Sequence, residues 1–320
     1  MTDLSIVIVS YKGWDRLVKC LEALDSFSGK SFSFEVILVD NMSGEDTIFA
    51  IEKRFSKFIF IHNSINGGYA NGCNRGVSIA KGSYILLLNP DTVAAESEIF
   101  RMIEVSRNNP QYGLVSCRQV NERGKESVAT GVFPAFFNLT GLQRAFLRSL
   151  KKKEPLAEAG TSFPDWVSGS VMLLSMETFR QVGGLDEDFW MYFEDVDLCR
   201  RIRDINLEIA FCTEIKIEHN HGGSSRINLN TASLTKTEVH ISRHIYISKH
   251  KSGVEKICIQ LFLVLNTLIT NGLIGIPGIV LFFIPKIFIR TLIFGSLISY
   301  YASSLSRLSW ISPRSVNFQN

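Results

Sequence analysis

The chain has 320 residues, of which 46% are hydrophobic and 20% charged, and a net charge of +3. These values are ordinary for a globular protein with one large domain or two smaller ones. Residues 251–320 contain six Lys or Arg residues and one acidic residue, a net charge of +5, which leaves −2 on residues 1–250. Because the basic excess lies in the most apolar part of the chain, it predicts contact with a membrane surface and argues against nucleic acid.

Cysteine usage indicates a reducing compartment. The six cysteines are scattered and form no C-x-x-C pair, a pattern typical of buried, reduced thiols in a cytosolic domain. No signal peptide pattern precedes the first strand, which begins at Leu4. We therefore expect the N-terminal part of the chain to lie in the cytoplasm.

Four apolar runs alternate with helical patterns in the first ninety residues. This alternation predicts an α/β fold, with a mostly parallel sheet flanked by helices on both faces. The predicted strands are Leu4–Ser10, Phe34–Val39, Phe58–His62 and Tyr84–Leu88, and the predicted helices are Trp14–Phe27, Glu45–Phe55 and Ala70–Ala80.

Three of these strands end in polar residues, namely Ser10-Tyr11, Asp40-Asn41 and Asn89-Pro90-Asp91. Proline cannot continue a strand, so the chain must turn there and hold Asp91 at the carboxyl edge, where α/β sheets bind ligands. A carboxylate at this edge can hold a divalent cation, which in turn can hold a diphosphate. The alternative is that Asp91 only caps a helix beginning near Ala94.

A glycine-rich segment, N-G-G-Y-A-N-G-C-N-R-G, begins at Asn66-Gly67 and runs into a helix. Its glycines allow close backbone approach, and a helix N-terminus with Asn74 nearby can receive a phosphate or a ribose. A bare glycine pattern is weak support. Its position just before the strand that leads to Asp91 strengthens the hypothesis of a nucleotide site.

Carboxylates flank a run of aromatic residues between Leu185 and Leu198. A solvated, acidic start of a helix explains Asp186–Asp188 but not Glu194-Asp195, whose apolar neighbours imply partial burial. Burial raises the proton affinity of a carboxylate, which suits a general base.

The remaining elements follow with weaker patterns. We expect a strand at Trp166–Leu174, a helix end at Gly183-Gly184, a helix at Glu194–Arg203, and short strands at Ile209–Phe211 and Ile215–Glu218. The basic segment Thr140–Lys153 suits a solvated surface helix, or alternatively an element that faces a membrane or the diphosphate of an acceptor.

The C-terminal part differs in kind from the rest. Ile257 to Pro285 is a stretch of 29 uncharged residues, and a second apolar run covers Thr291–Ser306. The first is long enough to cross a bilayer core. A transmembrane hairpin would place Lys286 and Arg290 on the unfavourable side, so in-plane or re-entrant helices stay open. We expect a domain at 1–250 and a membrane-associated helical region at 251–320.

Several motifs occur together and in order. They are S-I-V-I-V-S-Y (Ser5–Tyr11), V-D-N (Val39–Asn41), the glycine-rich segment, L-L-L-N-P-D-T, W-V-S-G-S (Trp166–Ser170) and Y-F-E-D-V-D-L-C-R-R (Tyr192–Arg201). In this combination the chain resembles glycosyltransferase family 2 over about residues 4–226, and the bacterial rhamnosyltransferase-like branch in particular.

The resemblance implies a GT-A fold and inverting transfer of a sugar from a nucleoside diphosphate. It places Asp40 at the nucleotide base, with Tyr11 and Asn74 nearby, and the strand-end residue Asn89 on the same side. Trp166 and Gly169 would form the acceptor wall. Arg201 would offset diphosphate charge, although a surface pairing with Asp197 or Asp204 is an equal alternative.

The resemblance also implies a Mg²⁺ or Mn²⁺ site and a catalytic base. Asp91 matches the last position of the family's D-x-D motif, which here reads Asn-Pro-Asp and so offers the metal one carboxylate. His219 resembles a histidine that completes the site in some relatives, with His221 as the competing choice. Asp195 matches the catalytic base, with Glu194 beside it.

The expected function is transfer of rhamnose or another deoxyhexose from a donor such as dTDP-rhamnose to a lipid-diphosphate-linked glycan in cell-surface polysaccharide synthesis. The enzyme would work on the cytoplasmic face of the inner membrane, anchored by residues of about 257–306. The alternatives are an inactive nucleotide-sugar-binding or scaffolding subunit, and a nucleotidyltransferase of the same fold class.

Overall fold

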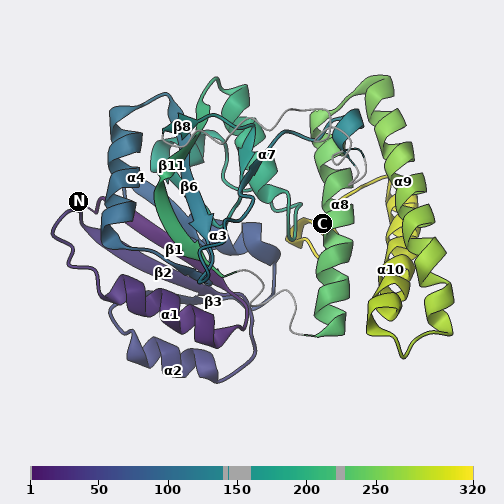
Figure 1. Cartoon of the computed structure of the whole chain (residues 1–320), viewed down its shortest axis with the longest axis horizontal. Coiled ribbons are helices and arrows are strands. Elements are labelled where there is room, and N and C mark those ends of the chain that lie inside the picture. Colours follow the sequence, from purple (N-terminus) through teal and green to yellow (C-terminus); the bar gives the residue numbers. More distant parts are fainter. Residues whose placement is uncertain (1, 140–142, 144–159, 221–227, 320) are drawn as a thin grey trace. The chain divides into compact units, whose positions relative to one another are not determined.

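The computed structural model describes residues 2–139, 143, 160–220 and 228–319. Contacts divide the chain into two compact units (Figure 1). The first unit takes its described residues from 1–133, 155–186 and 194–224, and the second from 134–154, 187–193 and 225–320. Apart from Gln143, the segment Thr140–Lys153, predicted to be helical, lies outside the described residues. The predicted division after residue 250 stays a prediction.

A nine-stranded sheet forms the centre of the first unit, with the order β3-β2-β1-β4-β10-β6-β11-β5 and β8 beside β11. Strands β1 to β4 are parallel, β10 is antiparallel to both of its neighbours, and β6 is parallel to β11. The sheet is thus mostly parallel, as predicted. Its strands are β1 (Leu4–Ser10), β2 (Phe34–Asp40), β3 (Ile59–His62), β4 (Tyr84–Leu88), β5 (Thr92–Val93), β6 (Tyr112–Val120), β8 (Thr161–Ser162), β10 (Val171–Ser175) and β11 (Glu208–His219).

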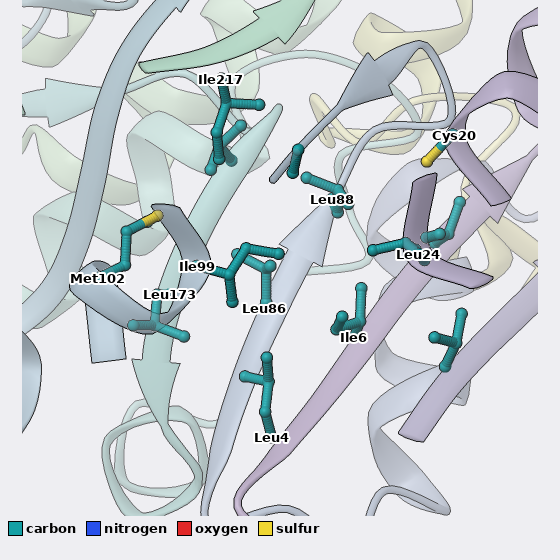
Figure 2. Packing of buried hydrophobic residues seen from close by; sticks show 14 of the residues in the cluster. Leu4, Ile6, Cys20, Leu24, Leu86, Leu88, Ile99, Met102, Leu173 and Ile217 are labelled. Carbon is teal, nitrogen blue, oxygen red and sulfur yellow. The ribbon is translucent and has the colours of Figure 1, made fainter. Parts of the chain in front are cut away.

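Helices cover both faces of this sheet because its central strands are apolar on both sides. Along β1, Ile6 and Ile8 pack with α1 (Trp14–Asp25), α2 (Thr47–Arg54) and α4 (Glu96–Asn108), as Figure 2 shows for part of this cluster. Val7 and Val9 point to the other face, against α3 (Gly68–Ser78), α6 (Met176–Gln181) and α7 (Glu194–Asp204). The strand-edge residues are therefore carried on a rigid three-layer core.

Two glycines of α3 bring that helix directly onto β1. A Cβ atom on Gly72 would lie 2.6 Å from Val9 Cγ1, and one on Gly76 would lie 2.4 Å from Val7 Cγ1. Both distances are far inside van der Waals contact. These two glycines of the predicted nucleotide segment therefore serve helix–strand packing, which fixes the start of α3 near the ends of β1 and β2.

Three elements differ from the sequence-based expectation. The predicted strand Trp166–Leu174 is interrupted at Ser168–Ser170, so that β9 (Trp166–Val167) leaves to pair with β7 (Thr130–Gly131) before β10 begins. The two short strands predicted after Ile209 form one strand, β11, with a bulge between Cys212 and Lys216. The N-cap position of α4 is Ala95 and not Asp91, and no side chain caps this helix, which leaves the Asp91 carboxylate available for another role.

The second unit is helical. It contains α8 (Leu229–His250), α9 (Gly253–Gly275) and α10 (Pro285–Arg307), with short helices η1 (Phe136–Asn138), η2 (Pro277–Ile279) and η3 (Val316–Gln319). Two segments are long and apolar enough to cross a membrane: Gly253–Ile279, with a mean hydropathy of 1.9, and Pro285–Arg307, with 1.2. These are the two apolar runs that the sequence assigned to membrane association, although the second helix begins at Pro285, earlier than predicted.

Candidate active site

The polar ends of the parallel strands meet at one edge of the sheet. Ser10 pairs with Asp40, and Asp40 pairs with His62, in the last register positions of β1, β2 and β3. β4 ends at Leu88, so Asn89 leaves the sheet at the same edge. Tyr11 follows Ser10 and is half-buried. The sequence-based grouping of these residues is thus reproduced by the strand register.

Asp40 is held as a fixed hydrogen-bond acceptor. It is 5% exposed, its Oδ1 accepts from the backbone N–H of Ser43 at 3.3 Å and from the Ser43 hydroxyl, and its Oδ2 lies 3.9 Å from His62 Nδ1. The residue after it, Asn41, donates to Asn66 Oδ1 at 3.0 Å. These bonds tie the end of β2 to the loop before α3.

That loop presents the start of α3. Gly67 is the N-cap residue, and Gly68 adopts a φ of 88°, which favours glycine. Asn66 Oδ1 accepts from the N–H of Gly68 at 3.2 Å. Asn74 lies nearly two helical turns further along and exchanges two hydrogen bonds with the backbone of Leu185, at 2.7 and 3.0 Å. Its side chain thus anchors α3 to the segment after α6.

Asp91 lies beside His219 at the meeting of β4, β5 and β11. His219 Nε2 is 3.1 Å from Asp91 Oδ1, and the His219 ring is almost fully buried. Arg16 Nη1 lies 3.7 Å from Asp91 Oδ2 and donates to the carbonyl oxygen of Asn220. The two residues that the family resemblance assigned to the metal are therefore neighbours, while His221 lies outside the described residues.

The orientation of the His219 ring suits a metal ligand. Gln119 Oε1 accepts from the Ser170 hydroxyl at 2.7 Å and lies 2.8 Å from His219 Nδ1. An oxygen acceptor at this position requires a proton on Nδ1, and in a neutral ring Nε2 then carries the lone pair. A carboxylate oxygen and an imidazole lone pair that converge in this way form a donor set for a divalent cation.

This donor set is small. Among the described residues, no group of three or more His, Cys, Asp and Glu side chains is arranged to hold a metal ion. Asp91 and His219 thus fit two positions of a Mg²⁺ or Mn²⁺ shell. A Mg²⁺ ion ordinarily shares its shell among one or two protein carboxylates, water and substrate phosphates, so two protein ligands are compatible with it.

Asp195 and Glu194 lie in the first turn of α7, where Glu194 is buried and Asp195 is half-buried. Asp195 Oδ2 accepts from the N–H of Gly169 and its Oδ1 from the N–H of Val196, both at 2.8 Å. Glu194 is 6% exposed, and its Oε2 has no hydrogen-bond partner among the described residues. Burial raises the pKa of Asp195, and burial together with the adjacent Asp195 raises that of Glu194 further.

The bend Ser168–Ser170 joins the two halves of the site. Gly169 binds Asp195 through its N–H, and its carbonyl oxygen accepts from the Tyr69 hydroxyl at 2.8 Å. Ser170 accepts from the N–H of Asn89 at 2.9 Å and donates to Gln119, the partner of His219. One three-residue segment therefore positions the candidate base and the candidate metal ligands together.

Sequence reasoning missed Gln119. Its partners, Ser170 and His219, lie 51 and 100 residues away in the chain, so no local pattern reveals the connection. The sequence around Gln119 gives little signal, because Ser116 and Arg118 in the same strand are polar as well; only its burial in the structure shows that the amide must have a partner.

Two predicted residues have structural partners of their own. The Trp166 indole N–H donates to the carbonyl oxygen of Val132 at 2.9 Å, and its ring packs on Gly131. Arg201 pairs with Asp197 at 2.7 Å and donates to the backbone carbonyl oxygens of Val182 and Gly184. The pairing of Arg201 is the one that the sequence left open as the alternative to diphosphate binding. Both ligand-binding roles stay predictions.

Comparison with known families gives two adjoining matches. The family described as "Glycosyl transferase family 2" matches residues 5–158, and the one described as "N-terminal domain of galactosyltransferase" matches residues 160–221. Together they cover the part of the chain that carries Asp40, Asp91, Asp195 and His219.

Curated relatives are similar over most of the chain. The low-salt glycan biosynthesis hexosyltransferase Agl10 of Haloferax volcanii is 26% identical over 69% of this chain and 68% of its own. The N-acetylglucosaminyl-diphospho-decaprenol L-rhamnosyltransferase of Mycobacterium tuberculosis is 24% identical over 79% and 87%. The rhamnosyltransferase WbbL of Escherichia coli is 26% identical over 62% and 75%.

Solved structures share the fold at low identity. GalNAc-T7, solved with UDP, GalNAc and Mn²⁺, superposes with a TM-score of 0.54 at 15% identity over 78% of this chain, which spans half of that protein's length. The mannosyltransferase PcManGT of Pyrobaculum calidifontis, solved with GDP-Man and Mn²⁺, gives 0.54 at 12% identity over 96% of this chain and 77% of its own. The first unit thus has the GT-A fold.

Proposed function

Since this chain belongs to glycosyltransferase family 2 and is similar to rhamnosyltransferases, we propose that it moves rhamnose or another deoxyhexose from a nucleoside-diphosphate donor to a lipid-diphosphate-linked glycan. dTDP-rhamnose is the favoured donor, because two of the relatives are named rhamnosyltransferases. The product would enter cell-surface polysaccharide. Transfer of a sugar from a nucleotide donor is the general activity of the family, and the sugar, acceptor and lipid linkage are the proposal.

The observation that carries the proposal is the Ser168–Ser170 bend, which binds Asp195 on one side and the partner of His219 on the other. Sugar transfer needs one group that takes a proton from the acceptor and another region that holds the donor phosphates. A scaffold shared by both groups fixes the distance between them, which is how an enzyme gains from orientation.

Asp195 is the proposed general base. Its Oδ atoms are held by the N–H groups of Gly169 and Val196, so the carboxylate is oriented before substrate arrives. Burial raises its pKa, which increases its affinity for the proton of an acceptor hydroxyl. The hydroxyl oxygen then attacks the anomeric carbon opposite the leaving diphosphate, which inverts the configuration.

Asp40, Tyr11 and the Asn66–Gly68 loop are proposed to hold the nucleotide, and Asp91 with His219 would hold Mg²⁺ or Mn²⁺. When bound, such an ion would act as a Lewis acid that stabilises charge on the departing diphosphate. Trp166 and Gly169 are proposed to face the acceptor. The enzyme would work on the cytoplasmic face of the inner membrane, attached through α9 and α10.

The test uses purified protein in detergent with a synthetic lipid-diphosphate sugar. dTDP-rhamnose, UDP-glucose, UDP-galactose and GDP-mannose are offered with Mg²⁺ or Mn²⁺, and nucleoside diphosphate and glycolipid product are both measured. We expect turnover with dTDP-rhamnose and an inverted anomeric configuration in the product. Asp195→Asn should lower kcat by roughly 10²–10⁴-fold, the usual contribution of a general base, and leave donor binding intact.

Asp204→Asn is the matched control, because it removes an exposed carboxylate from the same helix and should leave kcat unchanged. Tight nucleotide binding without turnover for any donor would overturn the proposal in favour of a non-catalytic binding subunit. Turnover with another donor would support the proposed transfer reaction but show that the transferred sugar is not rhamnose.

A further inference from the structure

The turn between α9 and α10 is apolar throughout. Residues 276–284 read I-P-G-I-V-L-F-F-I, without a charged or hydrogen-bonding side chain. Five of these side chains are strongly exposed, with exposed fractions of 58–74%: Ile276, Ile279, Val280, Phe282 and Phe283. Turns that face water are normally built from Gly, Pro, Asn, Asp and Ser. The composition of this tip therefore does not suit contact with water.

Most backbone N–H groups of the turn are hydrogen-bonded inside the hairpin, although those of Phe282 and Phe283 have no backbone acceptor among the described residues. The N–H groups of Ile276, Ile279, Val280, Leu281 and Ile284 donate to carbonyl oxygens between residues 272 and 281, at 3.0–3.1 Å. The Thr291 hydroxyl donates to the carbonyl oxygen of Gly275 at 2.7 Å. Internal satisfaction of this kind is required where a backbone lies in hydrocarbon and is optional in water.

The exposed apolar surface continues from the tip along one side of α9. Ile257, Leu261, Leu265, Ile269 and Leu273 recur every four residues and are all exposed. Exposed positions of α10 are more often small or polar, namely Gly295, Ser296, Ser299, Ala302 and Ser306, although Ile298 and Leu305 are exposed as well. The exposed surface of the hairpin is therefore strongly apolar along α9 and the tip and less apolar along α10. This asymmetry is expected for a hairpin that does not stand upright in the bilayer.

Charge is concentrated at the opposite end of the hairpin. Lys251 and Lys256 lie at the start of α9, Arg307 ends α10, and Arg314 follows it. This end complements the anionic headgroups of a membrane surface. Near the tip, Arg290 donates to the buried side chain of Asn271 at 3.0 Å, so its charge is partnered inside the hairpin. Lys286, the second residue of α10, is exposed beside the tip, and in a tilted hairpin its long side chain can extend to the near headgroups.

Length decides between crossing and oblique insertion. The uncharged part of α9, from Ile257 to Gly275, is about 28 Å long at 1.5 Å per residue, close to the bilayer core of about 30 Å. An upright hairpin would push its tip through to the far headgroups and place Phe282 and Phe283 in water. A tilted hairpin keeps them in hydrocarbon.

We propose that α9 and α10 form an oblique hairpin in the bilayer whose tip, residues 276–284, ends inside the hydrocarbon and does not emerge on the far side. The occupant of the exposed apolar surface is therefore lipid. This inference rests on the membrane attachment suggested under the proposed function, and it specifies a geometry that attachment alone leaves undefined.

Cysteine labelling tests it. Cys258 is the exposed native cysteine, and the other five are buried. In Cys258→Ser, therefore, no native thiol should react with the label. Val280→Cys and, separately, Phe283→Cys place a thiol at the tip. Ser252→Cys at the exposed start of α9 is the control. A membrane-impermeant maleimide is applied to spheroplasts and to inverted vesicles of an expressing bacterium, with and without detergent.

We expect Ser252→Cys to be labelled in inverted vesicles, and both tip variants to be labelled on neither side until detergent is added. Labelling of either tip variant in spheroplasts would show that the hairpin crosses the bilayer. This result would overturn the oblique geometry but not the proposed membrane attachment. Labelling of the tip in inverted vesicles without detergent would place it in water on the near side and also overturn the inference. Recovery of the chain in the soluble fraction would overturn the proposed attachment as well.

Discussion

Gln119 is a polar side chain inside the buried strand β6, and only 1% of its surface is exposed. Its carbonyl oxygen faces His219 Nδ1 and thereby sets which ring nitrogen points to Asp91. Amide or carboxylate partners of this kind orient metal-binding histidines in many proteins. Gln119 would therefore act on a metal held by Asp91 and His219 through the histidine, without touching the ion.

Gln119→Ala should weaken Mn²⁺ binding by roughly 10–100-fold, the usual effect of losing such a partner. Gln119→Glu retains an acceptor oxygen and should recover most of the affinity. Free Mn²⁺ is measured by electron paramagnetic resonance in the presence of nucleoside diphosphate. His219→Ala is the reference. If this variant binds Mn²⁺ as tightly as the unchanged protein, His219 is not a ligand. If His219→Ala loses affinity but Gln119→Ala does not, Gln119 has no positioning role.

At the scale of elements, the sequence predicted those parts that are buried on both faces. β1, β2 and β4 are continuous apolar runs, and each was found within one residue of its expected bounds. The bend at Ser168–Ser170 was not foreseen, because its bonds to Asn89, Gln119 and Asp195 depend on elements that are distant in sequence. The positions of candidate ligands at strand ends were thus readable, and the network that orients them was not.

The contact between α3 and β1 permits a sharp test of packing. Gly76→Ala forces a methyl group to within 2.4 Å of Val7 Cγ1 and should lower the free energy of unfolding by about 1–3 kcal/mol, as overpacking does. Val7→Ala in the same chain removes the obstructing methyl groups. We expect the double variant to be more stable than the sum of the two single changes predicts.

Thermal unfolding of the four proteins measures this coupling. The control is Gly295→Ala, because Gly295 lies in α10 with nothing within 4 Å of an added Cβ. Gly124→Ala would not serve, because Gly124 has a φ of +71°, which an alanine adopts only with strain. Gly295→Ala should therefore be neutral or stabilising. Strict additivity of Gly76→Ala and Val7→Ala would contradict the proposed contact.

Helix α8 contains a buried carboxylate that makes the second unit sensitive to pH. Glu238 is fully buried, its Oε2 accepts from the Ser312 hydroxyl at 2.9 Å, and its Oε1 lies 3.3 Å from Arg314 Nη1. Burial raises the pKa of Glu238 from 4.5 to about 7, in spite of these partners. The folded state thus binds this proton more tightly than the unfolded state does.

The sign of the pH effect follows from this difference. The stabilising contribution of the bound proton is fully present below pH 4.5, and it is lost as the pH rises through about 7. Glu238→Gln keeps an acceptor oxygen without a charge. At pH 8 it should stabilise the detergent-solubilised protein by up to about 3 kcal/mol, and at pH 4 the two proteins should unfold at similar temperatures. An equal difference at both pH values would contradict burial of the charge.

For the whole molecule, two forces can hold the chain on a membrane, and their sizes differ. Twelve large apolar side chains between Val254 and Phe283 are exposed, and each contributes up to about 1.5–3 kcal/mol when fully buried. A basic residue near an anionic surface contributes about 1 kcal/mol. Moreover, Lys251 is already paired with Glu255 and Arg314 with Glu238. The apolar term should dominate.

A wash with 1 M NaCl separates these forces, because it shortens the range of electrostatic interactions to about 3 Å and leaves apolar burial intact. We expect the protein to remain in the membrane fraction after this wash and to be released by detergent. Lys251→Gln with Lys256→Gln should change retention little, whereas Phe282→Ser with Phe283→Ser should reduce it. Release by salt alone would show that the basic residues, and not the apolar surface of α9 and its tip, hold the enzyme at the bilayer.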